Sequence, residues 1–221
     1  MRVRHSAPLL LALLLSGCRT LPRTGPASME PGDVGWEAAL LESSRRVEPY
    51  DGMDRQADLR ATLITPRLRR AFLVERARFH GRFAEQAQRE LLGMGSADEG
   101  VDRTPLARPP GEDQILVFVA FYAADLKHRD LASHTTIWDT HLVRGTTRVA
   151  PLAIEPVRLS PAVRELFSYV DRFDDVYLLR FPLVDPASAT ALLAPGADPL
   201  TLEVNSAVAE ASVSWSLFPA H

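Results

Sequence analysis

Residues 115–122 read Ile-Leu-Val-Phe-Val-Ala-Phe-Tyr, and this stretch decides the fold class. It is apolar at both odd and even positions and rich in the β-branched and aromatic residues that favour strands. It is also far shorter than the roughly 20 residues that a membrane-spanning helix needs. We therefore predict a central strand whose two faces are both covered by protein.

The C-terminal stretch 209–217 has the other pattern expected of a strand, a strict alternation. Glu210, Ser212, Ser214 and Ser216 point one way, whereas the opposite positions are Ala209, Ala211, Val213, Trp215 and Leu217. This alternation predicts a strand with one buried face and one face in water.

Further strands are expected at residues 59–64, 136–143, 147–156, 176–181 and 200–204. The second and third of these should form a hairpin around Arg144-Gly145-Thr146. About seven strands joined mostly by short turns, with no repeating βαβ pattern, indicate a mainly β fold with some α. We predict an antiparallel β-sandwich of the immunoglobulin or C2-like kind.

One long amphipathic helix should be inserted after the first strand. Thr65-Pro66 is a good helix start, and the helix should run to about Leu92, with Gly81 marking a bend or a break into two helices. Its apolar stripe comprises Leu68, Phe72, Phe79, Phe83, Ala87 and Leu91. This helix should cover a sheet face or an open end of the sandwich. Shorter helices are expected at 36–46 and from Pro161 to about Tyr169, and a Pro/Gly-rich loop at 96–113.

Composition excludes some classes of function. The chain has 221 residues, 46% of them hydrophobic, so residues 34–221 can form one domain with a packed core. The 25 Lys and Arg against 28 Asp and Glu leave a net charge of −3. This mild acidity gives no electrostatic case for a nucleic-acid partner. Cys18 is the single cysteine, so no disulfide can form within the chain.

The N-terminus combines a positive start with an apolar run. Arg2 and Arg4 precede residues 7–15, and Leu15-Ser16-Gly17-Cys18 follows. This ending resembles the lipobox of bacterial lipoproteins. The resemblance implies a signal peptide over residues 1–17, cleavage before Cys18, and fatty acyl chains such as palmitate on that cysteine. An ordinary secretory signal with a chance cysteine is the alternative.

The same resemblance bears on location. Residues 18–33, rich in Pro and Gly, should form a lipidated tether between the membrane and the folded domain. In lipoproteins of double-membrane bacteria an aspartate after the cysteine usually signals retention at the inner membrane. This chain has Arg19 at that position, which favours the outer membrane.

The densest group of polar side chains is that of Asp125, Lys127, His128, Arg129, Asp130, Ser133, His134, Asp139 and His141. Histidine and carboxylate side chains can bind zinc, so His128, His134, Asp139 and His141 are the candidate metal ligands. However, His128 and His134 have no recognised ligand spacing, and only Asp139 and His141 must share a strand face. We interpret the group as a solvated loop and an exposed strand face, and expect no metal.

A second group, Asp171, Asp174 and Asp175, contains three carboxylates that could bind calcium. It lacks the glycine and the ligand pattern of an EF-hand, so a turn before the next strand is the preferred interpretation. Trp138 and Trp215 are expected in the core. A carbohydrate-binding sandwich would instead need exposed aromatic residues on one sheet face, for which Trp138 and Tyr177 are the candidates.

The expected function follows from these patterns. The sequence has no Gly-x-Ser-x-Gly or phosphate-binding loop motif, and we assign no catalytic residue and no cofactor. We expect a lipoprotein of the bacterial envelope with a non-catalytic binding, scaffolding or assembly role and an envelope protein as partner. The alternative is a lipid-anchored hydrolase or metalloenzyme that uses the region Asp125–His141.

Overall fold

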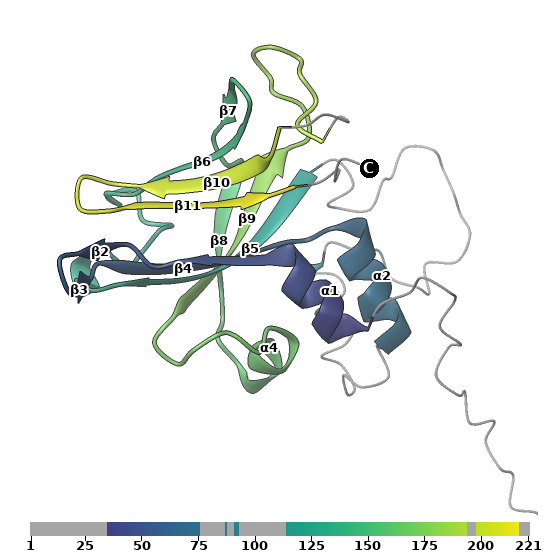
Figure 1. Cartoon of the computed structure of the whole chain (residues 1–221), viewed down its shortest axis with the longest axis horizontal. Coiled ribbons are helices and arrows are strands. Elements are labelled where there is room, and N and C mark those ends of the chain that lie inside the picture. Colours follow the sequence, from purple (N-terminus) through teal and green to yellow (C-terminus); the bar gives the residue numbers. More distant parts are fainter. Residues whose placement is uncertain (1–34, 76–86, 88–90, 93–113, 194–197, 217–221) are drawn as a thin grey trace, which may run out of the picture.

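The computed structural model describes residues 35–75, 87, 91–92, 114–193 and 198–216. Two antiparallel sheets pack face to face (Figure 1). One sheet has the order β1 (Ser44–Val47), β4 (Ala57–Leu63), β5 (Gln114–Ala123), β9 (Asp175–Pro182) and β8 (Ala153–Val157). The other has the order β11 (Glu210–Trp215), β10 (Leu200–Asn205), β6 (Asp139–Arg144) and β7 (Thr147–Val149). A hairpin of β2 (Tyr50–Asp51) and β3 (Asp54–Arg55) extends from one end. The fold is thus mainly β and sandwich-like.

The central position of residues 115–122 is confirmed. Strand β5 lies in the middle of the five-stranded sheet and pairs with β4 and β9. Val117 and Phe121 are buried against the other sheet, whereas Leu116 and Phe118 are buried beneath the helices. Both faces of the strand are therefore covered, as its unbroken apolar sequence predicts.

The alternation of the last strand is also confirmed. Ala211, Val213 and Trp215 are buried between the sheets, while Ser212 and Ser214 are exposed. The indole N–H of Trp215 donates to the carbonyl of Ser43, 2.7 Å away. This bond ties β11 of one sheet to the residue that precedes β1 of the other.

A second core lies outside the five-stranded sheet, under the helices α1 (Trp36–Ser43), α2 (Pro66–Glu75) and α4 (Pro161–Leu166). The Phe118 ring stacks on Phe167, with 3.7 Å between the ring centroids. The indole N–H of Trp36 donates to the carbonyl of Leu166 at 2.9 Å. Helix α1 therefore docks on the body, and it ends at Ser43 because the chain then pairs with β4.

The strand count and several strand boundaries differ from the expectation; for example, the strand expected at 136–143 begins at Asp139. The described residues form eleven strands instead of about seven, and an immunoglobulin-like topology is not confirmed. Short strands such as β2, β3 and β7 carry no apolar alternation that a sequence could reveal. The strand expected at 147–156 is divided, since β7 ends at Val149 and β8 joins the other sheet. The hairpin turn at Gly145 is confirmed, with φ at +56°.

The long helix is not evident. Helix α2 covers ten residues, and most of the remaining stretch to Leu92 lies outside the described residues, as does the loop 96–113. Ala87, Leu91 and Leu92 are buried in the second core, under the helices. The N–H of Leu92 donates to the carbonyl of Ala87, five residues earlier. That spacing belongs to a π turn rather than an α-helix. Helix α4 is capped by Ser160 as expected, but it ends at Leu166 rather than near Tyr169.

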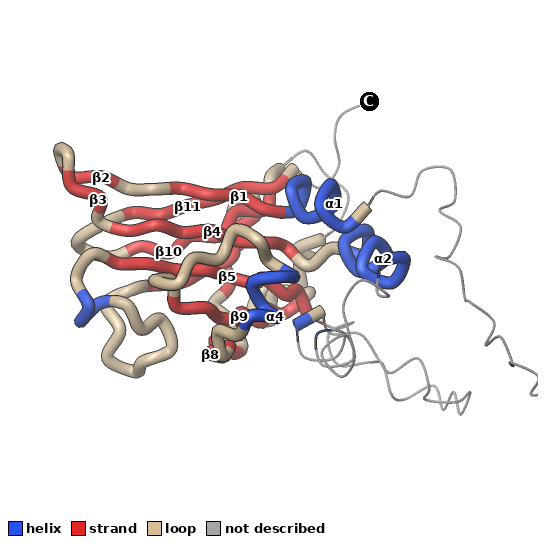
Figure 2. Tube along the Cα trace, turned by 90° about the horizontal axis from the view of Figure 1, so that it is seen from below, coloured by secondary structure: helices blue, strands red, loops and turns tan. Residues whose placement is uncertain are grey.

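The sandwich has two different ends. Helices α1 and α2 lie at one end (Figures 1 and 2). The other, called here the loop end, is formed by the β2–β3 hairpin, residues 124–138, residues 171–174 and the turn 206–209. No helix in the described part is long and apolar enough to cross a membrane. The predicted signal peptide, Cys18 and the tether fall outside the described residues.

Candidate functional site: a charged cavity at the loop end

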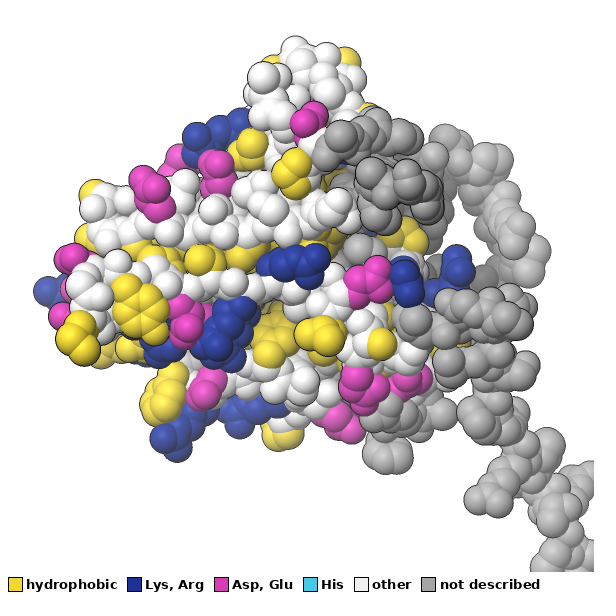
Figure 3. Space-filling view, viewed as in Figure 1, with side chains coloured by type: hydrophobic (Ala, Val, Ile, Leu, Met, Phe, Trp, Pro, Cys, Tyr) yellow, Lys and Arg dark blue, Asp and Glu magenta, His cyan; other side chains and the backbone are white. Residues whose placement is uncertain are grey.

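The outer face of the five-stranded sheet changes from apolar to charged along its length. The register sets Thr62 beside Phe118, Arg60 beside Ala120, and Asp58 beside Tyr122. The helices lie over the apolar part of this face, and the strands extend beyond them toward the loop end (Figure 2). Charged and apolar side chains lie next to one another there at the surface (Figure 3).

Asp58 is the buried centre of an ion-pair network, which we call the Asp58 cluster: Arg46, Glu48, Arg55, Asp58 and Arg60. The side chain of Asp58 is only 2% exposed. Its carboxylate accepts from Arg46 at 2.8 and 3.1 Å, from Arg60 at 2.9 Å, and from Arg55 at 3.3 Å. Glu48 bridges Arg46 and Arg55 at 2.6 and 3.1 Å.

The network explains why a carboxylate can be buried on this strand. Burial acts to raise the pKa of Asp58, but hydrogen bonds from Arg46 and Arg60 outweigh it, and the pKa lies below its usual value. The guanidinium group of Arg60 also donates a hydrogen bond to the carbonyl of Tyr169. The cluster therefore fixes its guanidinium groups at defined positions on the sheet face.

A cavity of about 350 Å³ opens beside this cluster. Its walls come from β3, β4, β5, the loop after β5 and the turn before β9. The lining residues are Arg55, Asp58, Arg60, Tyr122, Arg129, Asp171, Phe173 and Asp174. Three arginines, three aspartates and two aromatic rings thus border one small space, so the cavity suits a polar ligand.

Two arginines lie over the ring of Tyr122. The guanidinium carbons of Arg55 and Arg129 are 4.8 and 4.5 Å from the ring centroid. The Nε–H of Arg129 donates to the carbonyl of Ala123 at 2.9 Å. Arg129 forms no ion pair within the described part of the chain, in contrast to the arginines of the Asp58 cluster.

The loop that carries Arg129 is held by two buried aromatic residues. The hydroxyl of Tyr177 donates to the carbonyl of Arg129 and accepts from the N–H of Leu131, at 3.2 and 3.3 Å. Burial raises the pKa of Tyr177 to about 12. The indole N–H of Trp138 donates to the carbonyl of His128 at 2.6 Å. Trp138 is a core residue as expected, and Tyr177 is buried too, so neither presents a ring for carbohydrate stacking.

The turn Asp171–Asp174 forms the acidic wall of the cavity. The carboxylate of Asp174 accepts from the backbone N–H of Asp171 at 2.7 Å. Asp174 is buried, and burial raises its pKa. Asp175 already belongs to β9 and pairs with Phe121. Asp171 and Asp174 therefore belong to the turn that the sequence predicts. The three aspartates do not converge as calcium ligands.

The structure divides the group from Asp125 to His141 into separate parts. Asp125 caps the short helix η3 (Leu126–His128), and its carboxylate lies 4.0 Å from His128. Asp139 and His141 do share the outer face of β6, 3.3 Å apart, next to Arg148. His134 is exposed.

No three His, Cys, Asp or Glu side chains among the described residues converge to hold a metal ion. His128, His134, Asp139 and His141 are therefore not brought together as one ligand set.

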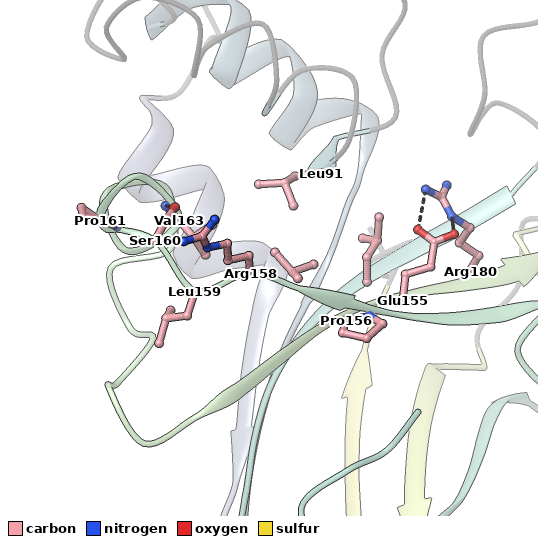
Figure 4. A pocket seen from close by; sticks show the side chains of 11 residues that line it. Leu91, Glu155, Pro156, Arg158, Leu159, Ser160, Pro161, Val163 and Arg180 are labelled. Atoms are coloured by element: carbon pink, nitrogen blue, oxygen red, sulfur yellow. Dashed lines mark hydrogen bonds and ion pairs between the residues drawn. The ribbon is translucent and has the colours of Figure 1, made fainter. Parts of the chain in front are cut away.

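Two other grooves have less specific linings. One of about 580 Å³ lies between β8, α4 and Leu91 (Figure 4). In this groove Arg180 donates to both carboxylate oxygens of Glu155, at 2.9 and 3.1 Å, so the two side chains neutralise each other. The other, of about 470 Å³, lies beside α1 and β1 and includes the exposed Leu41.

Exposed apolar side chains lie on the loops of this end of the sandwich. Met53, at the tip of the β2–β3 hairpin, is 96% exposed, and Phe173, at the cavity rim, is 54% exposed. Gly52 allows the tight hairpin turn with φ at +60°. Tyr50 is exposed on the same hairpin, and Leu126 and Val208 are exposed on other loops of this end. A polar cavity rimmed by apolar groups is typical of a binding surface.

Sequence reasoning missed this site because its residues come from distant segments. The usable signal was the pair Asp58 and Arg60, two charges on one face of an otherwise apolar strand. Arg129 was noted only as a charge within the candidate metal region. Comparisons with known proteins add nothing to the site: no protein-family model, curated protein or solved structure matches this chain.

Proposed function

We propose that this protein is a lipoprotein of the bacterial cell envelope, anchored through Cys18, whose domain binds a partner through the loop end. The anchor rests on the lipobox-like residues 15–18, and Arg19 favours the outer membrane. The binding role is non-catalytic.

One observation carries the binding role: a preformed cavity with charged walls lies among exposed apolar loop tips. Asp58 is committed to its three arginines, which makes it a structural group rather than a general base. Met53 and Phe173 offer apolar contact area near the cavity. The described chain begins beside α1, at the opposite end, so a tether attached there leaves the loop end free to meet a partner.

Site-specific photocrosslinking in cells tests this role. A photoreactive amino acid at Met53 should give a crosslinked product of discrete mass. The matched control at Ser212, exposed on the outer face of the four-stranded sheet, should give none. Equal products from both positions would contradict a binding surface at the loop end. Stoichiometric zinc in protein purified without chelator would instead favour the alternative, a metalloenzyme that uses the region Asp125–His141.

A further inference from the structure

The cavity at the loop end is lined by charges of both signs, and only some of them are paired: Asp58 pairs with Arg55 and Arg60, at 3.3 and 2.9 Å. Arg129 lines it and forms no ion pair within the described part of the chain. The same is true of Asp171 and Asp174, although they line the same space. Charged groups that border one cavity without closing an ion pair leave room for a ligand between them.

The two signs occupy different walls. The Asp58 cluster contains three guanidinium groups and two carboxylates, and therefore carries one excess positive charge. Arg129, whose guanidinium carbon lies 4.5 Å from the ring centroid of Tyr122, adds a second. The turn before β9 carries the carboxylates of Asp171 and Asp174. The cavity is thus bipolar rather than simply cationic or acidic.

Size restricts the ligand further. A volume of about 350 Å³ lies near the lower end of the roughly 300–1,000 Å³ usual for small-molecule sites. It suits a ligand of amino-acid size. The face of Tyr122 is already covered by two arginines. The exposed ring of Phe173 at the rim remains available to an aliphatic side chain.

We propose that this cavity binds a zwitterionic α-amino acid, with its carboxylate at Arg129 and its ammonium group at Asp171 and Asp174. The inference goes beyond the proposed partner-binding role and concerns a cavity at the same end of the domain. A guanidinium fork matches a carboxylate in two parallel hydrogen bonds. One zwitterion satisfies both walls at once, whereas an anion or a cation alone leaves one wall uncompensated.

Leucine and its two blocked forms provide the test. Calorimetry on the full-length lipoprotein in detergent would compare leucine with leucine methyl ester, which lacks the carboxylate, and N-acetylleucine, which lacks the ammonium group. Leucine should bind, and each blocked form should bind at least about ten times more weakly. Equal binding of leucine and N-acetylleucine, or no binding of leucine, would overturn the proposal.

A pair of arginine variants checks the location. Arg129→Met should weaken leucine binding by at least about tenfold. The control is Arg172→Met, because Arg172 also lies 4.5 Å from an aromatic ring, that of Phe173, but does not line the cavity. Equal effects of the two variants would refute the site. If Arg129→Met fails to fold, Asp171→Asn, at an exposed turn position, must weaken leucine binding in its place.

The two proposals fail separately. Loss of leucine binding with the Met53 crosslinks intact would remove the ligand class and leave the partner-binding role. Leucine binding without specific crosslinks would support the cavity assignment and refute partner binding at the loop end.

Discussion

Replacing Asp58 by alanine should destabilise the domain more than replacing any exposed carboxylate. The substitution removes the acceptor shared by Arg46, Arg55 and Arg60. Arg46 and Arg55 are 47% and 37% exposed and keep Glu48 as a partner. Arg60 is 18% exposed and loses its carboxylate altogether.

The expected loss of unfolding free energy follows from how exposed each arginine is and which partners it keeps. Removing one partner of a buried ion pair costs about 3–5 kcal/mol, because the other charge is left uncompensated. Since water and Glu48 compensate two of the three arginines, we expect a loss near the lower limit, about 3 kcal/mol. The control is Asp139→Ala, at a carboxylate that is 66% exposed and paired with Arg148. That change should cost under about 0.5 kcal/mol.

Urea unfolding of the mature domain, followed by tryptophan fluorescence, measures both variants. Equal losses of unfolding free energy for Asp58→Ala and Asp139→Ala would refute the argument from burial. The pH dependence gives a second check. Because the folded-state pKa of Asp58 is lowered, its contribution is fully present above the unfolded pKa of about 3.9. The contribution is lost as the pH falls through the folded pKa. The difference between wild type and Asp58→Ala should therefore shrink in acid.

Three further predictions concern the anchor, the core and the acidic wall. Cys18→Ser should abolish lipidation, and mass spectrometry of the mature N-terminal peptide checks it; an unmodified wild-type Cys18 would contradict the anchor. Trp215→Ala should cost about 3–5 kcal/mol, whereas the exposed Ser214→Ala should cost under about 0.5 kcal/mol, as measured by urea unfolding. Asp174→Asn should stabilise the domain at neutral pH, because burial raises the pKa of Asp174 and its ionisation opposes folding. This gain should disappear below about pH 4, where the carboxyl is protonated in both the folded and the unfolded protein. A gain that did not depend on pH would contradict the ionisation of Asp174 as its cause.

Several features followed from local sequence because their physical cause is local. The unbroken apolar run 115–122 required cover on both faces, and the alternation of β11 required one wet face. The Ser160-Pro161 helix start depends only on a hydroxyl cap and a preset φ, and it is present. The lipobox resemblance is likewise local, and it stays a prediction.

Other features depended on contacts between distant segments, which no local pattern contains. The division of residues 147–156 between two sheets depends on which partner each half pairs with. The cavity requires the register between β4 and β5, which brings Asp58 to Tyr122. It also requires Tyr177, which holds the backbone of Arg129 from 48 residues away. Charge types are visible in sequence, but only tertiary packing decided that Asp58 is buried and paired while Arg129 borders an open cavity.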